Sequence, residues 1–141
     1  MRYGWMTGLL IVVFCTALAA QDSTRPAQDA AGYAGTWAGT WAGGPDGGSG
    51  ELEITIEKTS TGSLTGKLKA TGGASEHTAP FKTLTIDAGT LKARYDYPLG
   101  DGGEVALDAA VEASSAKGTW ALYPPGQTTE AARGTFVVTR R

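Results

Sequence analysis

The chain has 141 residues, a length suited to one domain rather than two. Its 21 glycines and its lack of long helix-favouring runs indicate an all-β protein with many turns. The formal net charge is −2, and no run of basic residues interleaved with aromatic ones is present. A nucleic-acid partner is therefore not expected.

The first 20 residues have the composition of a secretory signal peptide. Arg2 supplies a positive start, an apolar run covers 9–14, and small residues suit cleavage after Ala19 or Ala20. The apolar run is shorter than the roughly 20 residues that a membrane-spanning helix needs. We expect an exported protein, periplasmic or extracellular, with no stable membrane insertion after signal cleavage. Cys15 is the only cysteine and lies in this segment, so the mature chain should contain no disulfide.

Residues 21–34 are small and polar and have no periodicity, which predicts a flexible linker. The folded domain is then expected at 35–141. It consists of short runs in which apolar and polar residues alternate, separated by turn residues. Eight strands are predicted, at about 35–41, 51–59, 64–71, 81–87, 90–97, 104–112, 116–123 and 134–140.

The alternation gives each strand one apolar face and one polar face, as in antiparallel sheets. Eight such strands joined by short turns predict an up-and-down meander closed into a small barrel, with the last strand paired to the first. A two-sheet sandwich is the alternative that the same alternation allows.

Turn lengths predict how neighbouring strands pair. The Ala88-Gly89 turn should place Ile86 opposite Leu91. By the same reasoning, Ala109 should face Trp120 across Ser114-Ser115, and Ile56 should face Leu68 across 61–63. Phe81 is out of phase with Leu84, which indicates a bulge near Lys82 or a later strand start.

The connections fall into two classes. Those after the second, fourth and sixth strands are tight, whereas 42–50, 72–80, 98–103 and 124–133 are longer. In a meander, alternate connections lie at the same end, so the longer loops should all lie at one end. Trp37 is then expected near the tight-turn end, closing the base of the barrel.

Inward residues near the long-loop end are the candidate ligand-binding residues. They would form a mostly apolar mouth with tyrosine hydroxyls as polar groups, suited to a small apolar or aromatic ligand. The set is Trp41, Leu52, Tyr95, Tyr97, Val105, Leu122 and Phe136.

Catalytic chemistry is not indicated. His77 is the sole histidine, next to Glu76 in a glycine-bearing loop, and is expected to be solvated. No nucleophile, base and orienting group are visibly arranged together. Asp46, Asp101 and Glu104 lie in separate loops without the spacing of a metal site, so no metal and no cofactor are expected.

Two short motifs carry a family resemblance. Gly35-Thr36-Trp37 is similar to the Gly-x-Trp that opens lipocalins, and together with Leu64-Thr65-Gly66 it resembles avidin-like barrels. The chain thus resembles the calycin superfamily over 35–141, which implies a small barrel with a ligand site inside it. It lacks a lipocalin-type Thr-Asp-Tyr triplet. Ala38, Gly39, Ala42 and Gly43 stand where avidin-like proteins carry polar residues, so biotin binding is not carried over.

The expected function is that of a non-catalytic exported binding module, a monomer, for a small apolar or aromatic ligand. One alternative is a structural or interaction domain with a filled core and no ligand. A second alternative is an enzyme that uses His77, in which case the imidazole should point into a cavity.

Overall fold

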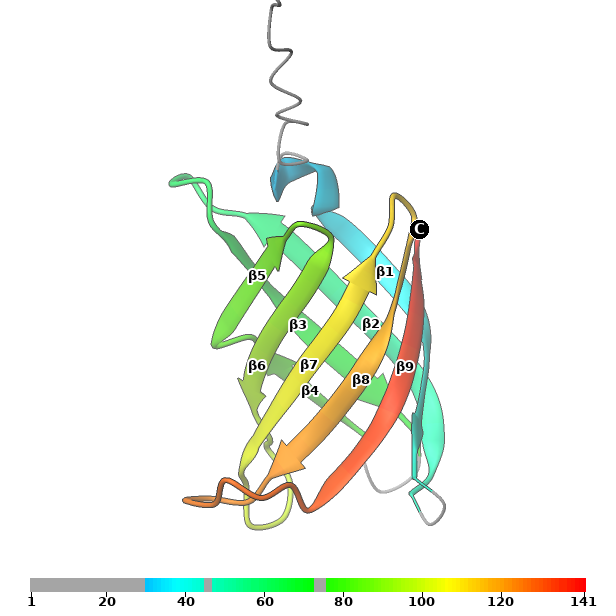
Figure 1. Cartoon of the computed structure of the whole chain (residues 1–141), viewed down its shortest axis with the longest axis vertical. Coiled ribbons are helices and arrows are strands. Elements are labelled where there is room, and N and C mark those ends of the chain that lie inside the picture. The colour runs from blue at the N-terminus through cyan, green and yellow to red at the C-terminus, as the bar shows by residue number, and fades with distance from the viewer. Residues whose placement is uncertain (1–29, 45–46, 73–75) are drawn as a thin grey trace, which may run out of the picture.

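The computed structural model describes residues 30–44, 47–72 and 76–141 (Figure 1). It is an all-β fold: nine antiparallel strands form one sheet that curls into a barrel-like shape, with a short 3-10 helix, η1 (Ala30–Tyr33), at one end. The signal peptide predicted at 1–20 and most of the predicted linker lie outside the described residues. The strands are β1 (Gly35–Gly43), β2 (Ser49–Lys58), β3 (Leu64–Thr71), β4 (His77–Pro80), β5 (Thr83–Asp87), β6 (Thr90–Asp96), β7 (Glu104–Val111), β8 (Ser115–Tyr123) and β9 (Ala132–Arg140).

The strand order is β4-β3-β2-β1-β9-β8-β7-β6-β5. The predicted meander is confirmed, and so is the pairing of the last strand with the first, because β1 pairs antiparallel with β9. One continuous sheet is present rather than the two of a sandwich.

The fourth strand was predicted at 81–87, but the chain over 77–87 holds two strands, β4 and β5. The described residues therefore form nine strands and not the eight that were predicted. β4 pairs with β3 and β5 pairs with β6. Between them the chain passes from one edge of the sheet to the other: the Phe81 amide donates to Gly66 O at 2.9 Å, and the Lys82 amide donates to Arg94 O at 2.7 Å. Ala79 and Phe81, which precede this break in the chain, are buried, and so is Leu84, which follows it. The break near Lys82 thus explains why Phe81 is out of phase with Leu84.

The predicted apolar faces of the strands are the buried faces in the structure. Of the three strand pairings predicted from turn length, one has the expected register. Ile86 pairs with Leu91 as expected. At the other two turns the pairing is shifted by two residues, so Leu107 rather than Ala109 faces Trp120, and Gly66 rather than Leu68 faces Ile56. A shift of two keeps every side chain on its face, which is why the burial pattern could be predicted although the register could not.

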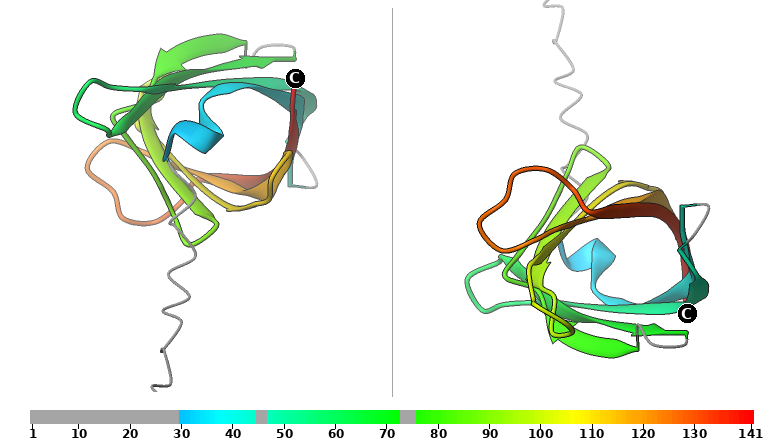
Figure 2. Two further views of the ribbon diagram at one scale, coloured as in Figure 1. Left: turned by 90° about the horizontal axis from the view of Figure 1, so that it is seen from above. Right: turned by 90° about the horizontal axis from the view of Figure 1, so that it is seen from below.

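The end of the sheet near η1 is plugged (Figure 2). Residues 30–34, expected as linker, form η1 and its link to β1, and Tyr33 is buried. The Trp37 indole donates to Tyr33 O at 3.0 Å, and the Arg140 guanidinium lies 5.2 Å from the centre of the Trp37 ring. Arg140 also donates to the carbonyls of Gly32 and Ala34. The expectation that Trp37 closes this end is confirmed.

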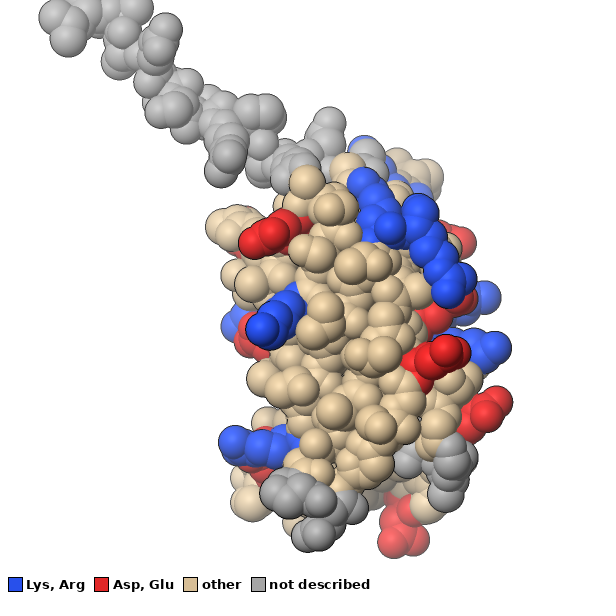
Figure 3. All heavy atoms as spheres, turned by 90° about the vertical axis from the view of Figure 1, so that its right-hand side faces the viewer, with Lys and Arg blue, Asp and Glu red and all other residues tan. Residues whose placement is uncertain are grey.

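Charge is spread over the outside of the sheet. Figure 3 shows a face with a broad uncharged centre and basic and acidic side chains around it. Among the described residues, Val137 is the one large hydrophobic residue that is exposed. No helix in the described part of the chain is long and apolar enough to cross a membrane.

Candidate functional site

A cavity of about 220 Å³ lies at the end of the sheet opposite η1. This is the end at which β1, β3, β6 and β8 all finish, as the loop lengths predicted (Figure 1). The lining is mainly aliphatic and aromatic. It consists of Trp41, Gly47, Gly48, Leu52, Leu68, Ala70, His77, Tyr95, Tyr97, Val105, Leu107, Trp120, Leu122 and Ala132.

The cavity brings together six of the seven residues that the sequence proposed as ligand-binding. These are Trp41, Leu52, Tyr95, Tyr97, Val105 and Leu122. They come from the ends of β1, β6 and β8 and the starts of β2 and β7, with Tyr97 just after β6.

Phe136 is the exception. It is 1% exposed and lies with Trp37, Ile54 and Val138 around a void of about 10 Å³. A void of that size is at the lower limit for a single water molecule, so this half of the interior is filled. Phe136 therefore belongs to the packed core and not to the cavity, which corrects the sequence prediction.

Two tryptophans are held at the mouth in the same way. The Trp41 indole donates to Thr71 O at 3.0 Å, and the Trp120 indole donates to Ala42 O at 3.2 Å. Each indole crosses a glycine on the adjacent strand: a Cβ on Gly50 would lie 2.8 Å from Trp41 Nε1, and one on Gly134 would lie 2.6 Å from Trp120 Nε1. The two rings meet edge to face with centroids 6.1 Å apart.

His77 is not the solvated loop residue that the sequence predicted. It begins β4, is half-buried and lines the cavity. Its Nε2 is 2.9 Å from the Tyr95 hydroxyl, and its ring packs edge to face on Tyr97 at 5.0 Å. The signal was present in the alternation of His77, Ala79 and Phe81 with Thr78 and Pro80, but nearby glycines and Pro80 suggested a loop.

Tyr95 is the most buried polar group of the cavity, with 4% exposure. Burial raises the pKa of its phenol well above the ordinary value, and the nearby Tyr97 raises it further. The Tyr95 hydroxyl is therefore protonated across the physiological range and acts as a neutral hydrogen-bonding group.

Trp120, Leu107 and Leu68 also line the cavity although the sequence did not select them. The reason for Trp120 is the register. Trp120 lies opposite Leu107 instead of the expected Ala109. Leu107 is two residues nearer the start of β7, and therefore nearer the long-loop end. Turn length alone did not indicate this shift.

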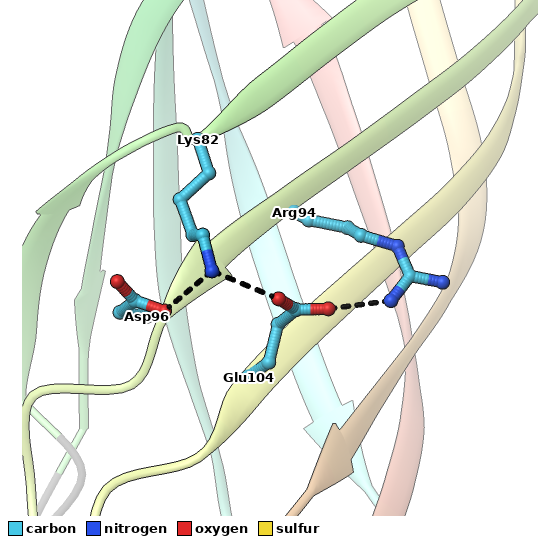
Figure 4. Close-up of polar contacts among 4 residues, drawn as sticks. All are labelled: Lys82, Arg94, Asp96 and Glu104. Atoms are coloured by element: carbon cyan, nitrogen blue, oxygen red, sulfur yellow. Dashed lines mark hydrogen bonds and ion pairs between the residues drawn. The ribbon is translucent and has the colours of Figure 1, made fainter. Parts of the chain in front are cut away.

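A larger groove of about 720 Å³ is lined by Arg94, Asp96, Tyr97, 102–104 and 123–128. It is open to solvent, and its charged groups are already paired. Figure 4 shows the network: Lys82 contacts Asp96 and Glu104, each at 3.1 Å, and Arg94 contacts the other oxygen of Glu104. A groove whose charges are already paired offers little to a ligand, so the cavity with its mainly apolar lining is the better candidate for a ligand site.

No metal site is found among the described residues, since they contain no group of three or more His, Cys, Asp or Glu that could hold an ion. Comparison with protein-family models, with curated proteins and with solved structures found no match to this chain. The geometry of the cavity is therefore what a functional proposal has to rest on.

Proposed function

We propose that the protein is an exported, non-catalytic, monomeric binding module of calycin-like type whose ligand is a small apolar or aromatic molecule held in the long-loop cavity. The observation that carries this proposal is the cavity itself. It is lined mainly by aromatic and aliphatic side chains and lies at one end of an interior that is filled at the other end.

Cavity size limits the ligand. An apolar cavity of about 150 Å³ accommodates benzene, and pockets for drug-sized molecules begin at about 300 Å³. The present volume of about 220 Å³ lies between them. We therefore favour a ligand built on one or two rings over a long fatty acid or isoprenoid chain.

The enzyme alternative is supported by one observation, that His77 lines the cavity. Among the described residues that line the cavity, the others with ionisable or nucleophilic groups are Tyr95 and Tyr97, which carry phenols. Binding is favoured because, among the described residues, the lining offers an acid–base reaction these three side chains and no other ionisable group.

The proposal can be tested by titrating the protein with fatty acids, small aromatics and isoprenoids while following tryptophan fluorescence. Trp41 and Trp120 line the cavity, so an occupant should change their emission. We expect saturable responses with small aromatics. Absence of a response from every compound would contradict the proposal and favour the alternative of a structural or interaction domain without a ligand.

A matched pair of variants locates the site. Val105→Phe adds a ring inside the cavity and should abolish the response, whereas Val137→Phe adds the same ring at a position that is 43% exposed and should leave it unchanged. An undiminished response in folded Val105→Phe protein would place the ligand elsewhere.

A further inference from the structure

Apart from the two indoles, the polar side chains among the described residues of the cavity lining form one cluster of Tyr95, Tyr97 and His77. Tyr95 and Tyr97 come from β6 and the residue just after it, and His77 comes from β4, at the opposite edge of the sheet order. The His77 and Tyr95 rings are 5.6 Å apart, and Phe81 packs edge to face on Tyr95 at 6.2 Å. The ring of Tyr95 is thus held between two neighbours, which fixes the position of its hydroxyl.

The Tyr95 hydroxyl has hydrogen-bonding capacity beyond its contact with His77. A phenol offers one donor and two acceptor sites, and the 2.9 Å contact with His77 Nε2 uses one of them. If Tyr95 donates to Nε2, its oxygen can still accept from a ligand. If Nε2–H donates instead, the phenol hydrogen can still be given to a ligand. A hydroxyl on the ligand suits both states because a hydroxyl both donates and accepts.

The ligand should carry no formal charge. The cavity lining includes no Asp, Glu, Lys or Arg among the described residues. Transfer of an unpaired carboxylate or ammonium from water into such surroundings costs far more than transfer of a neutral hydroxyl that gains a hydrogen bond. A phenol is uncharged near neutral pH, as the phenol of Tyr95 itself is.

From these observations we infer that the cavity recognises a neutral hydroxyl-bearing aromatic, a phenol-type molecule, whose hydroxyl bonds to Tyr95 beside His77 while its ring lies among the aromatic and aliphatic side chains. This inference rests on the proposed function. It adds the chemical class of the ligand and names Tyr95 as the residue that recognises the ligand hydroxyl.

The test uses three probes that share a tolyl group: 4-methylphenol, toluene and 4-methylbenzoate. They present a hydroxyl, no polar group and a negative charge, respectively. Calorimetric titration of the full chain should show 4-methylphenol binding about three- to tenfold more tightly than toluene, the range that one net hydrogen bond provides. 4-Methylbenzoate should bind more weakly than 4-methylphenol.

The variant Tyr95→Phe removes the hydroxyl and keeps the ring. It should bind 4-methylphenol and toluene with nearly equal affinity. Tyr123→Phe is the matched control, since Tyr123 is not among the residues that line the cavity, and it should keep the preference of the original chain.

The outcomes separate the two proposals. Binding of none of the probes would overturn the proposed function. Equal binding of toluene and 4-methylphenol, tighter binding of 4-methylbenzoate, or a preference that persists in Tyr95→Phe would overturn this inference and leave the binding module standing. If Tyr95→Phe does not fold, the unaltered chain can be tested by nuclear Overhauser contacts with bound 4-methylphenol. Contacts with the Tyr95 and His77 rings would support the inference. Contacts confined to other residues would overturn it.

Discussion

At the residue scale, glycines decide where the tryptophans can lie. Gly50 and Gly134 stand opposite Trp41 and Trp120 on the neighbouring strands, and a side chain at either position would occupy the space that the indole crosses. The missing Cβ lets each indole reach a carbonyl on the strand beyond. The recurring pairing of glycine with an aromatic residue is thus a packing requirement at the mouth of the cavity.

Gly134→Ala should destabilise the protein. The added Cβ would lie 1.9 Å from Ala42 O and 2.6 Å from Trp120 Nε1, so either the strand or the indole must move. We expect a loss of about 1–3 kcal/mol in the free energy of unfolding, measured by urea denaturation. Gly44→Ala is the control because its nearest atom, Arg133 O, would be at 3.8 Å. Equal stability of the two variants would contradict this account.

At the element scale, η1 and β9 are joined at the plugged end by one side chain. Arg140 stacks over Trp37 and donates to carbonyls of η1 and of the residue that follows it. The last carbonyls of a 3-10 helix have no partner within the helix, and this guanidinium accounts for one of them, Gly32 O, and for Ala34 O just beyond.

Arg140→Met keeps the apolar stem and removes the guanidinium. We expect it to lower the free energy of unfolding by about 1–3 kcal/mol, because hydrogen bonds from a charged donor to partly buried carbonyls are lost. Near-UV circular dichroism should report the loosened Trp37 ring. Arg141→Met, which removes only an exposed contact with Glu53 at 3.5 Å, should stay within about 0.5 kcal/mol of the unaltered chain.

At the scale of the whole molecule, the sheet curls round so that the chain passes from one edge strand to the other at Phe81 and Lys82. The ion network of Figure 4 lies on the β5 side of this crossing, because Lys82 directly precedes β5 and its carboxylate partners lie on the neighbouring strands, Asp96 on β6 and Glu104 on β7. Hydrogen bonds from Arg94 and then from Lys82 lower the pKa of Glu104, and bonds to Asp96 and Glu104 raise the pKa of Lys82.

Stability should therefore depend on pH through Glu104. Its pKa is lower in the folded state than in the unfolded chain, so its contribution is present above the ordinary carboxyl pKa of about 4.3 and is lost as the pH falls through the lower folded value. Glu104→Gln should melt below the unaltered chain at pH 7, and the gap should narrow towards pH 3. Glu112→Gln, at an exposed position, is the control. A gap of equal size at both pH values would refute the role of the charge.

Much of the candidate site could be predicted from alternation and loop length. These fix which side chains point inward and at which end they lie, and six cavity residues follow from them. His77 and Trp120 could not be placed in this way. His77 joins the site because the chain crosses between sheet edges just after β4, and Trp120 joins it because the register is shifted by two residues.

What the sequence determined by itself is the periodic part of the protein: an all-β meander, its inward faces, and the pairing of its last strand with its first. These follow from local alternation and from the need to bury one face of every strand. The tertiary structure alone decided where the interior is filled and where it is hollow. That depends on how side chains from distant strands meet, as Phe136 does with Trp37 and as His77 does with Tyr95.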